Sequence, residues 1–536
     1  MSRFLPYCLL FFAFLLPCTQ AQSADDCPNP TRNTPFVFKL PPGLDPSQVS
    51  VQFFSNNSCT IKENTNSTLG YYLDSDGVQQ PIHLATGTDP ATSKNYRYTM
   101  KQLTSTHAIG NTPANVPALC LHTFSGRVYI SLSQDGLQGF NSGYVQPNPA
   151  NSSDANNNIR YQYFEPTIDK TGINVDLTYI DLVSIGMGMD AVNAPTTYNN
   201  SPQTTTVNTK TLVEAVAGTT SPYAGNVIPS ASAILPNKNF LRVLPPMDFS
   251  ASESPYHSWD DYLTSLHTYT KGTTPQPIII RGCFNGSTDT ADFPDHPERL
   301  NSQFYDYHVT IDTDGSATFT PQTDSGVPNL NCGGIATKSS DNIVHGIGNQ
   351  GSITITAADL KDVNGIYGCD PKATKTYVDP VTNVMIAPEY GKAGNDVFGR
   401  IVGDLTAGLN YGFPGSTHLF TSTLFPSGME VGKMDSQYWW GHTNDKDTGA
   451  VIPSAQTPAG QNVAFSVVQS NPKYYNTYAN GLLPYTTGYG FAYQDRASKN
   501  LLSFNAQVDT ASYLRITVNP DISTSSIAAE NFLLLQ

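Results

Sequence analysis

Short runs of alternating apolar and polar residues, separated by turn-forming residues, dominate this chain. Such alternation predicts strands, because successive side chains of a strand point to opposite faces of a sheet. The clearest runs are residues 36–40, 49–54, 127–132, 277–281 and 514–518. The dipeptide Asp314-Gly315 separates residues 307–311 from 317–320 and predicts a hairpin there. The pattern therefore predicts a mainly β protein.

Helical patterns are fewer and come late in the chain. Ser258 is expected to cap a helix with Trp259, Tyr262, Leu263 and Leu266 on one face. Two further helices are predicted at 397–409 and 211–216, and a Ser/Thr/Asn-rich connector at 196–211. We therefore expect two regions, 22–210 and 211–536, with the helices in the second.

The first 21 residues have the pattern of a secretory signal peptide. Arg3 precedes an apolar run at 4–17, and a small residue, Ala21, offers a cleavage point. The apolar run is too short to span a bilayer. We expect a secreted protein, extracellular or in the cell wall. Six cysteines follow the signal, an even number that predicts disulfides in an exported chain: Cys27, Cys59, Cys120, Cys283, Cys332 and Cys369. Asn56, Asn66, Asn151, Asn199 and Asn285 begin glycosylation sequons.

Charge and aromatic content restrict the partners. The formal net charge is −15, which disfavours nucleic acid and anionic membranes as partners. Only 13% of residues are charged, whereas 11% are aromatic, 29 of them tyrosine. A neutral polysaccharide suits this balance because its recognition needs flat apolar surfaces and hydroxyl partners. Tyrosine enrichment in secreted β-rich proteins is the alternative explanation.

Motifs for cofactors and metals are unconvincing. Residues 346–351 match GxGxxG, but a strand pattern follows where a dinucleotide site needs a helix. Residues 74–77 and 312–315 resemble the start of a calcium loop, yet Ala85 and Thr323 stand where the bidentate glutamate belongs. We read both as hairpin turns and expect neither cofactor nor metal.

Two acids follow aromatic strand patterns close together in the chain. Tyr161, Tyr163 and Glu165 alternate, which places them on one face, and residues 173–181 alternate up to Asp181. Residues 169–172 form a natural turn between the two runs. Adjacent strands lie about 5 Å apart, so a modest stagger gives the ~6.5–9.5 Å carboxyl separation of inverting glycosidases. A chance pairing is the competing explanation, since the chain has 43 acids.

The segments around these acids resemble the glycoside hydrolase family 64 β-1,3-glucanases, whose fold is related to thaumatin. Phe164-Glu165-Pro166-Thr167 and Tyr179-Ile180-Asp181 resemble the active-site region of the family. Residues 239–246, 259–262, 401–410, 475–479 and 489–495 match other family segments in the same order.

This resemblance implies a β-barrel or sandwich domain over 22–210 that carries the catalytic carboxylates and a mixed α/β domain over 211–536, beside an open groove. C-terminal strands are expected to return to the barrel. The resemblance also implies an inverting, endo-acting enzyme that releases short laminari-oligosaccharides. We expect a monomer. Glu165 corresponds to the general acid, Asp181 to the general base and Thr167 to a position near the substrate. Tyr161 and Tyr163 are expected to line the site and bind substrate, and with Phe164 to limit hydration of the acid.

Some positions depart from the family pattern. Asn174 replaces a groove tryptophan of some bacterial members, and Gln494-Asp495-Arg496 replaces the usual Asp-Asp-Val. Two other functions stay open: a non-catalytic β-glucan-binding protein on the same scaffold, and a structural cell-wall glycoprotein. Release of reducing sugar from linear β-1,3-glucan separates the enzyme from both.

Overall fold

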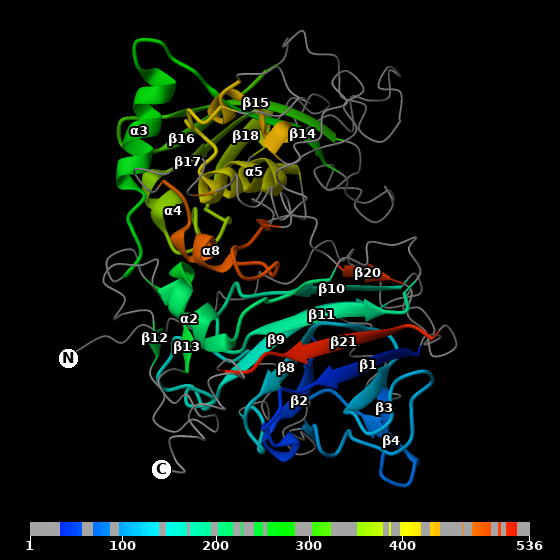
Figure 1. Cartoon of the computed structure of the whole chain (residues 1–536). Helices are drawn as coiled ribbons and strands as arrows, with labels where there is room; N and C mark the ends of the chain where they lie inside the picture. The colour runs from blue at the N-terminus through cyan, green and yellow to red at the C-terminus, as the bar shows by residue number, and fades with distance from the viewer. Residues whose placement is uncertain are drawn as a thin grey trace, which may run out of the picture.

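The computed structural model has two lobes, a β-sandwich and a second sheet covered by helices (Figure 1). It describes residues 33–55, 68–85, 96–138, 146–168, 172–194, 202–217, 227–228, 241–249, 254–284, 303–322, 351–378, 385–386, 397–419, 429–439, 465, 474–494, 502–504 and 511–521. The mainly β class predicted from the alternating pattern is confirmed.

The first sheet of the sandwich mixes both ends of the chain. Its strands, in spatial order, are β11 (Met187–Val192), β21 (Tyr513–Val518), β1 (Thr34–Lys39), β6 (Ala118–Leu121), β3 (Gly70–Leu73) and β4 (Gln79–Ile82). β21 runs parallel to β1, and the other pairs are antiparallel. The C-terminal strand β21 thus lies inside the N-terminal sheet.

The second sheet carries the two candidate strands and is antiparallel throughout. Its order is β20 (Leu502–Phe504), β10 (Ile173–Leu177), β9 (Tyr161–Ile168), β8 (Arg127–Ser131), β2 (Ser50–Phe54) and β5 (Tyr98–Thr99), with β7 (Phe124–Ser125) also paired to β9. β9 and β10 form the predicted pair, with Ile168 opposite Ile173. Residues 169–171 of the predicted turn lie outside the described residues.

The inner faces of the two sheets share one core. Phe36 of β1 stacks on Phe164 of β9 with ring centroids 6.5 Å apart. Val175 and Leu177 of β10 belong to the same fully buried cluster. Burial of such side chains, each contributing roughly 1.5–3 kcal/mol, fixes which face of β9 and β10 points inward.

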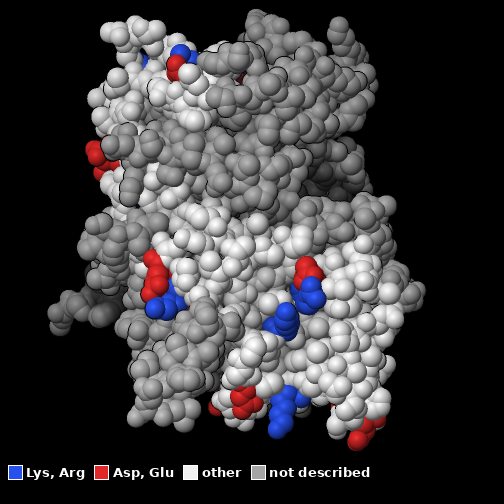
Figure 2. Space-filling model, in the orientation of Figure 1, with Lys and Arg blue, Asp and Glu red and all other residues white. Residues whose placement is uncertain are grey.

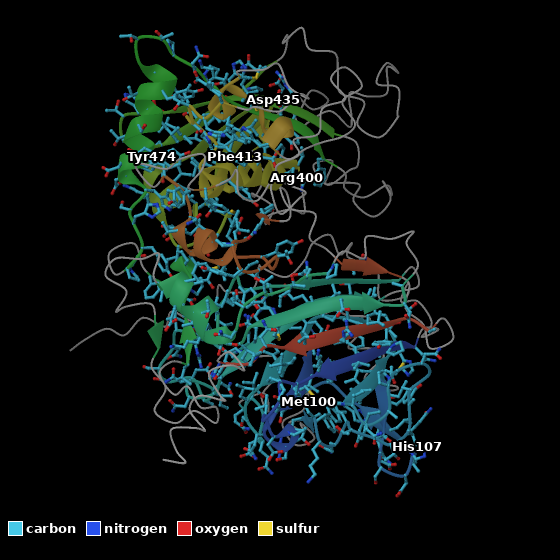
Figure 3. The ribbon with its side chains drawn as sticks, viewed as in Figure 1. Met100, His107, Arg400, Phe413, Asp435 and Tyr474 are labelled. Carbon is cyan, nitrogen blue, oxygen red and sulfur yellow. The ribbon has the colours of Figure 1, made fainter. Side chains whose placement is uncertain are left out.

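The second lobe is an antiparallel meander with helices packed on it. Its strands are β14 (Ile278–Phe284), β15 (Gln303–Ile311), β16 (Ala317–Pro321), β17 (Ser352–Ile355), β18 (Thr374–Val378) and β19 (Met385–Ile386). Helix α3 (Asp260–Lys271) packs on β15, and helix α5 (Val397–Tyr411) packs on β14 and β15. The predicted hairpin joins β15 to β16, and Gly315 adopts φ +89° in its turn, where glycine carries no side-chain penalty. Figure 3 labels Phe413 of this core and Met100 of the sandwich core.

Shorter elements complete the two lobes. The helices are α2 (Thr209–Ala217), α4 (Ala357–Lys361), α6 (Ser436–Trp439) and α8 (Thr477–Leu482), and the 3-10 turns are η1 (Pro46–Gln48), η3 (Pro246–Asp248) and η7 (Val431–Lys433). β12 (Val227–Ile228) pairs with β13 (Arg242–Val243). The domain boundary expected between 210 and 211 falls inside α2. Leu212 and Val216 of α2 pack into the sandwich core, so the sandwich continues past residue 210.

The surface shown in Figure 2 is sparsely charged. Charged side chains of the described residues form small, scattered groups of both signs on a mostly uncharged face (Figure 2). No helix in the described parts of the chain is long and apolar enough to cross a membrane. This face offers no continuous charged patch among the residues drawn.

Cys120 differs from the disulfide prediction. It is a free thiol, buried on β6 among apolar neighbours such as Val37 and Ala118. Burial raises its pKa to about 12, so the thiol stays protonated and unreactive. The prediction that all six cysteines form disulfides is therefore wrong for Cys120. Cys27, Cys59 and Cys332, and the side chain of Cys283, lie outside what the structure describes.

Candidate active site

Glu165 sits on the outer face of the second sheet. Phe164, Pro166 and Ile168 of β9 lie opposite Leu177, Val175 and Ile173, whose side chains fill the sandwich core. The alternate residues Tyr161, Tyr163, Glu165 and Thr167 must point the other way, as their alternation predicted. The side chain of Glu165 is 18% exposed, so it is reachable from solvent and yet largely desolvated.

Asp181 reaches this face by a route that alternation did not predict. β10 ends at Leu177, and Tyr179 still points inward, where its hydroxyl accepts a hydrogen bond from the Met187 amide. The chain bends at residues 180 and 181. Extending the alternation of 173–179 to Asp181 was wrong, because the strand stops first and the bend turns the carboxylate toward Tyr163 on the outer face. The residue directly opposite Glu165 is Asp176.

One buried arginine joins the two acids. Arg127, the first residue of β8, donates from Nε to Glu165 Oε1 and from Nη1 to Asp181 Oδ2, both at 2.8 Å. Its side chain is 3% exposed. Two carboxylates that contact one planar guanidinium at this distance have their contacting oxygens within about 8 Å of each other. This bound admits the separation of inverting glycosidases and also the shorter one of retaining glycosidases.

One carboxylate oxygen of Asp181, Oδ2, accepts three hydrogen bonds. Besides Arg127, Oδ2 accepts hydrogen bonds from the Tyr163 hydroxyl at 2.7 Å and from Gln146 Nε2 at 2.9 Å. Three donors on one oxygen suit an ionised carboxylate, which accepts only. Among the described residues no donor contacts Oδ1, and none contacts Oε2 of Glu165. Each acid thus has one oxygen fixed by Arg127 and one left for chemistry.

The electrostatics around Glu165 favour its protonated form. Burial raises the pKa of Glu165, the negative charge of Asp181 adds to the rise, and Arg127 opposes both. A single cation faces two carboxylates, so retaining one proton relieves their repulsion. The geometry therefore assigns the proton to the acid with fewer donors, Glu165.

The tyrosines support the acids instead of facing solvent. Tyr161 and Tyr163 are each 1% exposed, so neither ring is available for stacking on a sugar, contrary to the direct substrate contact expected of them. The guanidinium of Arg127 lies 4.2 Å from the ring centroid of Tyr163, within the range of a cation–π interaction. Both rings lie on the same face of β9 as Glu165, and the second role expected of them, limiting hydration of the acid, stays a prediction.

Partly exposed polar side chains continue the row beyond Glu165. Thr167 lies opposite Asn174, and its hydroxyl is 3.2 Å from that of Ser125 on β7. All three are partly exposed on the outer face. This row places the position expected near the substrate, Thr167, beside the departure at Asn174. Arg496 lies outside the described residues.

Four residues of the site were not identified from sequence. Arg127 had a usable signal, because a charged residue opens an apolar strand pattern. Asp176 had a weaker one, since an acid interrupts an otherwise apolar alternation. Gln146 and Asp248 had none. Burial, followed by the charge of Asp181, raises the pKa of Asp248 well above its usual range, and its Oδ2 has no hydrogen-bond partner among the described residues.

The chain is similar to one known family and to several solved structures. Residues 56–288, which include Glu165 and Asp181, match the family model Glyco_hydro_64, described as beta-1,3-glucanase. No curated protein matches the chain. Similar solved structures include a laminaripentaose-producing beta-1,3-glucanase in complex with laminaritetraose, with 16% identity over 91% of this chain and 99% of that one and a TM-score of 0.46.

Two bacterial structures are also similar. A beta-1,3-glucanase domain from Clostridium beijerinckii has 14% identity over 91% of this chain and 98% of its own, with a TM-score of 0.45. A laminaripentaose-producing beta-1,3-glucanase from Paenibacillus barengoltzii has 18% identity over 47% of this chain and 60% of its own, with a TM-score of 0.28.

Proposed function

We propose that the chain is a secreted, endo-acting and inverting β-1,3-glucanase of glycoside hydrolase family 64, whose family model matches residues 56–288. Its fold is proposed to be thaumatin-like, with an open groove between the lobes. The products are proposed to be short laminari-oligosaccharides. The site supports this proposal through one observation: Arg127 fixes one oxygen of Glu165 and one of Asp181.

In the proposed reaction Glu165 is the general acid. Its raised pKa keeps a proton on the carboxyl group, and Oε2 is the oxygen with no donor among the described residues. That oxygen delivers the proton to the glycosidic oxygen as the bond to the anomeric carbon breaks. The leaving sugar departs as an alcohol, and Glu165 is left ionised beside Arg127.

Asp181 is the general base. Its Oδ2 is occupied by Arg127, Tyr163 and Gln146, so Oδ1 takes the proton of the attacking water. The water adds to the anomeric carbon from the side opposite the leaving oxygen, which inverts the configuration. Proton exchange with solvent then returns Glu165 to its protonated form and Asp181 to its ionised form.

Substrate contacts are proposed along the outer face of β9. Thr167, with Ser125 and Asn174 beside it, offers hydroxyl and amide partners for a sugar next to the cleavage point. A neutral glucan suits these groups and the sparse charge of the surface in Figure 2.

Two measurements test the function. Purified protein should release reducing sugar from linear β-1,3-glucan, and proton NMR of the first product should show the α-anomer before mutarotation. Initial β-anomer would mean a retaining enzyme with a different nucleophile. Binding of the glucan without any release of sugar would favour the non-catalytic binding protein.

A further inference from the structure

The segment that carries Asp181 lies outside regular structure. It begins where β10 ends, with a single bridge between Thr178 and Tyr489, and it ends at a bridge between Val183 and Val243. Between these bridges the position of Asp181 depends on bonds from side chains elsewhere, because strand pairing has stopped.

Gln162 supplies three of these bonds. Its Nε2 donates to the carbonyl oxygen of Thr178 at 3.0 Å and to that of Leu182 at 3.2 Å. Its Oε1 accepts from the amide of Ser184 at 3.1 Å. Gln162 is fully buried on the inner side of β9, between Tyr161 and Tyr163. One amide group thus ties both sides of the bend to the strand that carries Glu165.

A second residue, which directly precedes β9, binds the segment that follows the bend. Arg160 donates from Nη2 to the carbonyl oxygen of Ser184 at 2.7 Å. The same guanidinium pairs with both carboxylate oxygens of Asp521, at 2.6 and 2.9 Å. Both side chains are buried, so this pair locks the segment after β21 against the end of the bend.

We propose that Gln162 is a positioning residue for Asp181, acting through the 178–184 segment. This inference rests on the proposed function. A glutamine is required there because it presents two donors to two carbonyl oxygens and one acceptor to an amide while remaining uncharged. Losing these bonds frees the bend and displaces Asp181 from the line of attack, although Gln162 touches neither acid.

Two substitutions separate positioning from bulk stability. Gln162→Met keeps the length and removes all three bonds, so kcat should fall about 10- to 100-fold, the cost of a displacement near 1 Å. KM should change less than about threefold, since no sugar contact is lost. Gln162→Glu keeps one donor and an acceptor while the new carboxyl is protonated. Once ionised, that carboxyl repels both carbonyl oxygens.

The pH profile therefore distinguishes the two variants. Burial raises the pKa of the introduced carboxyl above its reference value of about 4.3. Gln162→Glu should retain most activity at acidic pH and lose it toward neutral pH. This loss should appear as an additional decline in the pH profile of kcat that the wild type does not have. Gln162→Met should be impaired at every pH. Because the protonated variant is nearly isosteric with glutamine, it is expected to fold at acidic pH even where Gln162→Met does not.

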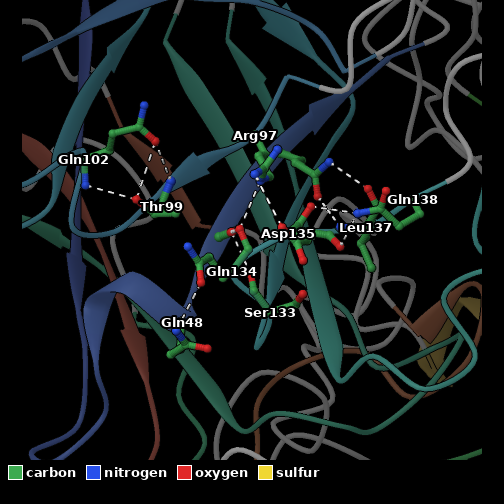
Figure 4. A network of polar contacts seen from close by, with 12 residues as sticks. Gln48, Arg97, Thr99, Gln102, Ser133, Gln134, Asp135, Leu137 and Gln138 are labelled. Carbon is green, nitrogen blue, oxygen red and sulfur yellow. Dashed lines mark hydrogen bonds and ion pairs between the residues drawn. The ribbon is translucent and has the colours of Figure 1, made fainter.

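Gln52 provides a matched control. It is equally buried, and its amide donates to the Leu137 carbonyl at 3.1 Å and accepts from the Leu137 amide at 2.7 Å. Leu137 lies in the loop held also by Arg97 and Gln134 (Figure 4), which carries none of the proposed catalytic groups. Gln52→Glu should lower thermal stability at neutral pH yet leave the pH profile of kcat unchanged.

The outcomes separate this inference from the function. If wild type hydrolyses the glucan and Glu165→Gln does not, the function stands. If both Gln162 variants then have the kcat and the pH profile of the wild type, the positioning role is overturned. It is also overturned if kcat of Gln52→Glu falls toward neutral pH in the same way as that of Gln162→Glu. Failure of the wild type to hydrolyse any β-1,3-glucan would overturn the proposed function itself.

Discussion

Glu165 and Asp181 accept hydrogen bonds from the same buried guanidinium, that of Arg127. One cation can balance only one of the two carboxylates when both are ionised. The second then gains by keeping its proton, which agrees with the raised pKa of Glu165. The arrangement therefore favours one protonated and one ionised carboxyl group before substrate arrives.

Replacing Arg127 should damage both activity and stability. Arg127→Met leaves two neighbouring acids without their cation, a change that costs about 3–5 kcal/mol in comparable buried pairs. The loss should shrink at pH values low enough to protonate both acids. Urea unfolding at pH 4 and pH 7 measures it, with Arg515→Met as the control. Arg515 pairs with Asp190 but is 40% exposed, so its loss should cost only about 0–1 kcal/mol. Equal costs for the two variants at pH 7 would contradict the buried role of Arg127.

Tyr163→Phe tests the support of Asp181. The variant keeps the ring over Arg127 and removes the 2.7 Å hydrogen bond to Oδ2. A hydrogen bond to a charged group contributes about 1.5–3 kcal/mol, so kcat should fall up to about 100-fold. KM should change little, because the buried Tyr163 ring offers no contact to a sugar. Tyr269→Phe, which loses a bond to the Gly432 carbonyl in the other lobe, should leave both quantities unchanged.

The strands of the site were predictable, and the course of the chain between them was not. Alternation identifies β9 because its inner residues Phe164 and Ile168 face a continuous core. The same rule fails for Asp181, since its position depends on where β10 stops and on three bonds from Gln162, a residue far less distinctive than the acids. Arg127 is visible in sequence only as a charge at the start of a strand. Its pairing with both acids depends on the order of β8, β9 and β10, which local patterns do not contain.

The assignment of elements to the two lobes was also only partly predictable from the sequence. Helices α3 and α5 follow from their apolar periodicity and were predicted close to their observed bounds. The packing of α2 against the sandwich core was not predicted, because Leu212 and Val216 are apolar residues that suit the core of either lobe. The free thiol of Cys120 also escaped prediction, since an even cysteine count indicates pairing without saying which residues pair.

Asp248 should make stability depend on pH in a defined direction. Its pKa is raised in the folded protein by burial and then by Asp181, against about 3.9 in the unfolded chain. Between these values only the unfolded chain releases the proton. The stabilisation is therefore complete below about pH 4 and is lost as pH rises through the folded pKa.

Asp248→Asn removes this titration, so its melting temperature should rise relative to wild type between pH 4 and pH 7. Asp314→Asn is the control of opposite sign. Hydrogen bonds from Ser316 lower the pKa of Asp314, so this substitution should cost stability at pH 7 more than at low pH. A constant difference between Asp248→Asn and wild type at both pH values would contradict the raised pKa of Asp248.

Asp181→Asn should be inactive in a way that a better leaving group does not repair. The amide cannot take the proton of the attacking water, so an activated aryl glycoside accepted by the site should react no faster. Added azide, which needs no base, should restore part of the rate by attacking from the side of Asp181. Recovery with the activated substrate alone would mean that Asp181 is not the base.

The most direct test of the account is hydrolysis of linear β-1,3-glucan by Glu165→Gln beside wild type. The amide keeps the shape and the contact with Arg127 but cannot deliver a proton, so the rate should fall by about 10²–10⁴ while oligosaccharide binding persists. An activated aryl glycoside should recover part of the lost rate, because its leaving group needs little protonation. The wild-type rate should be bell-shaped, with an optimum near pH 4–6, roughly the range set by two carboxyls of which one is raised. If Glu165→Gln keeps more than about a tenth of wild-type activity on the glucan, well short of the loss expected for a general acid, Glu165 is not the acid.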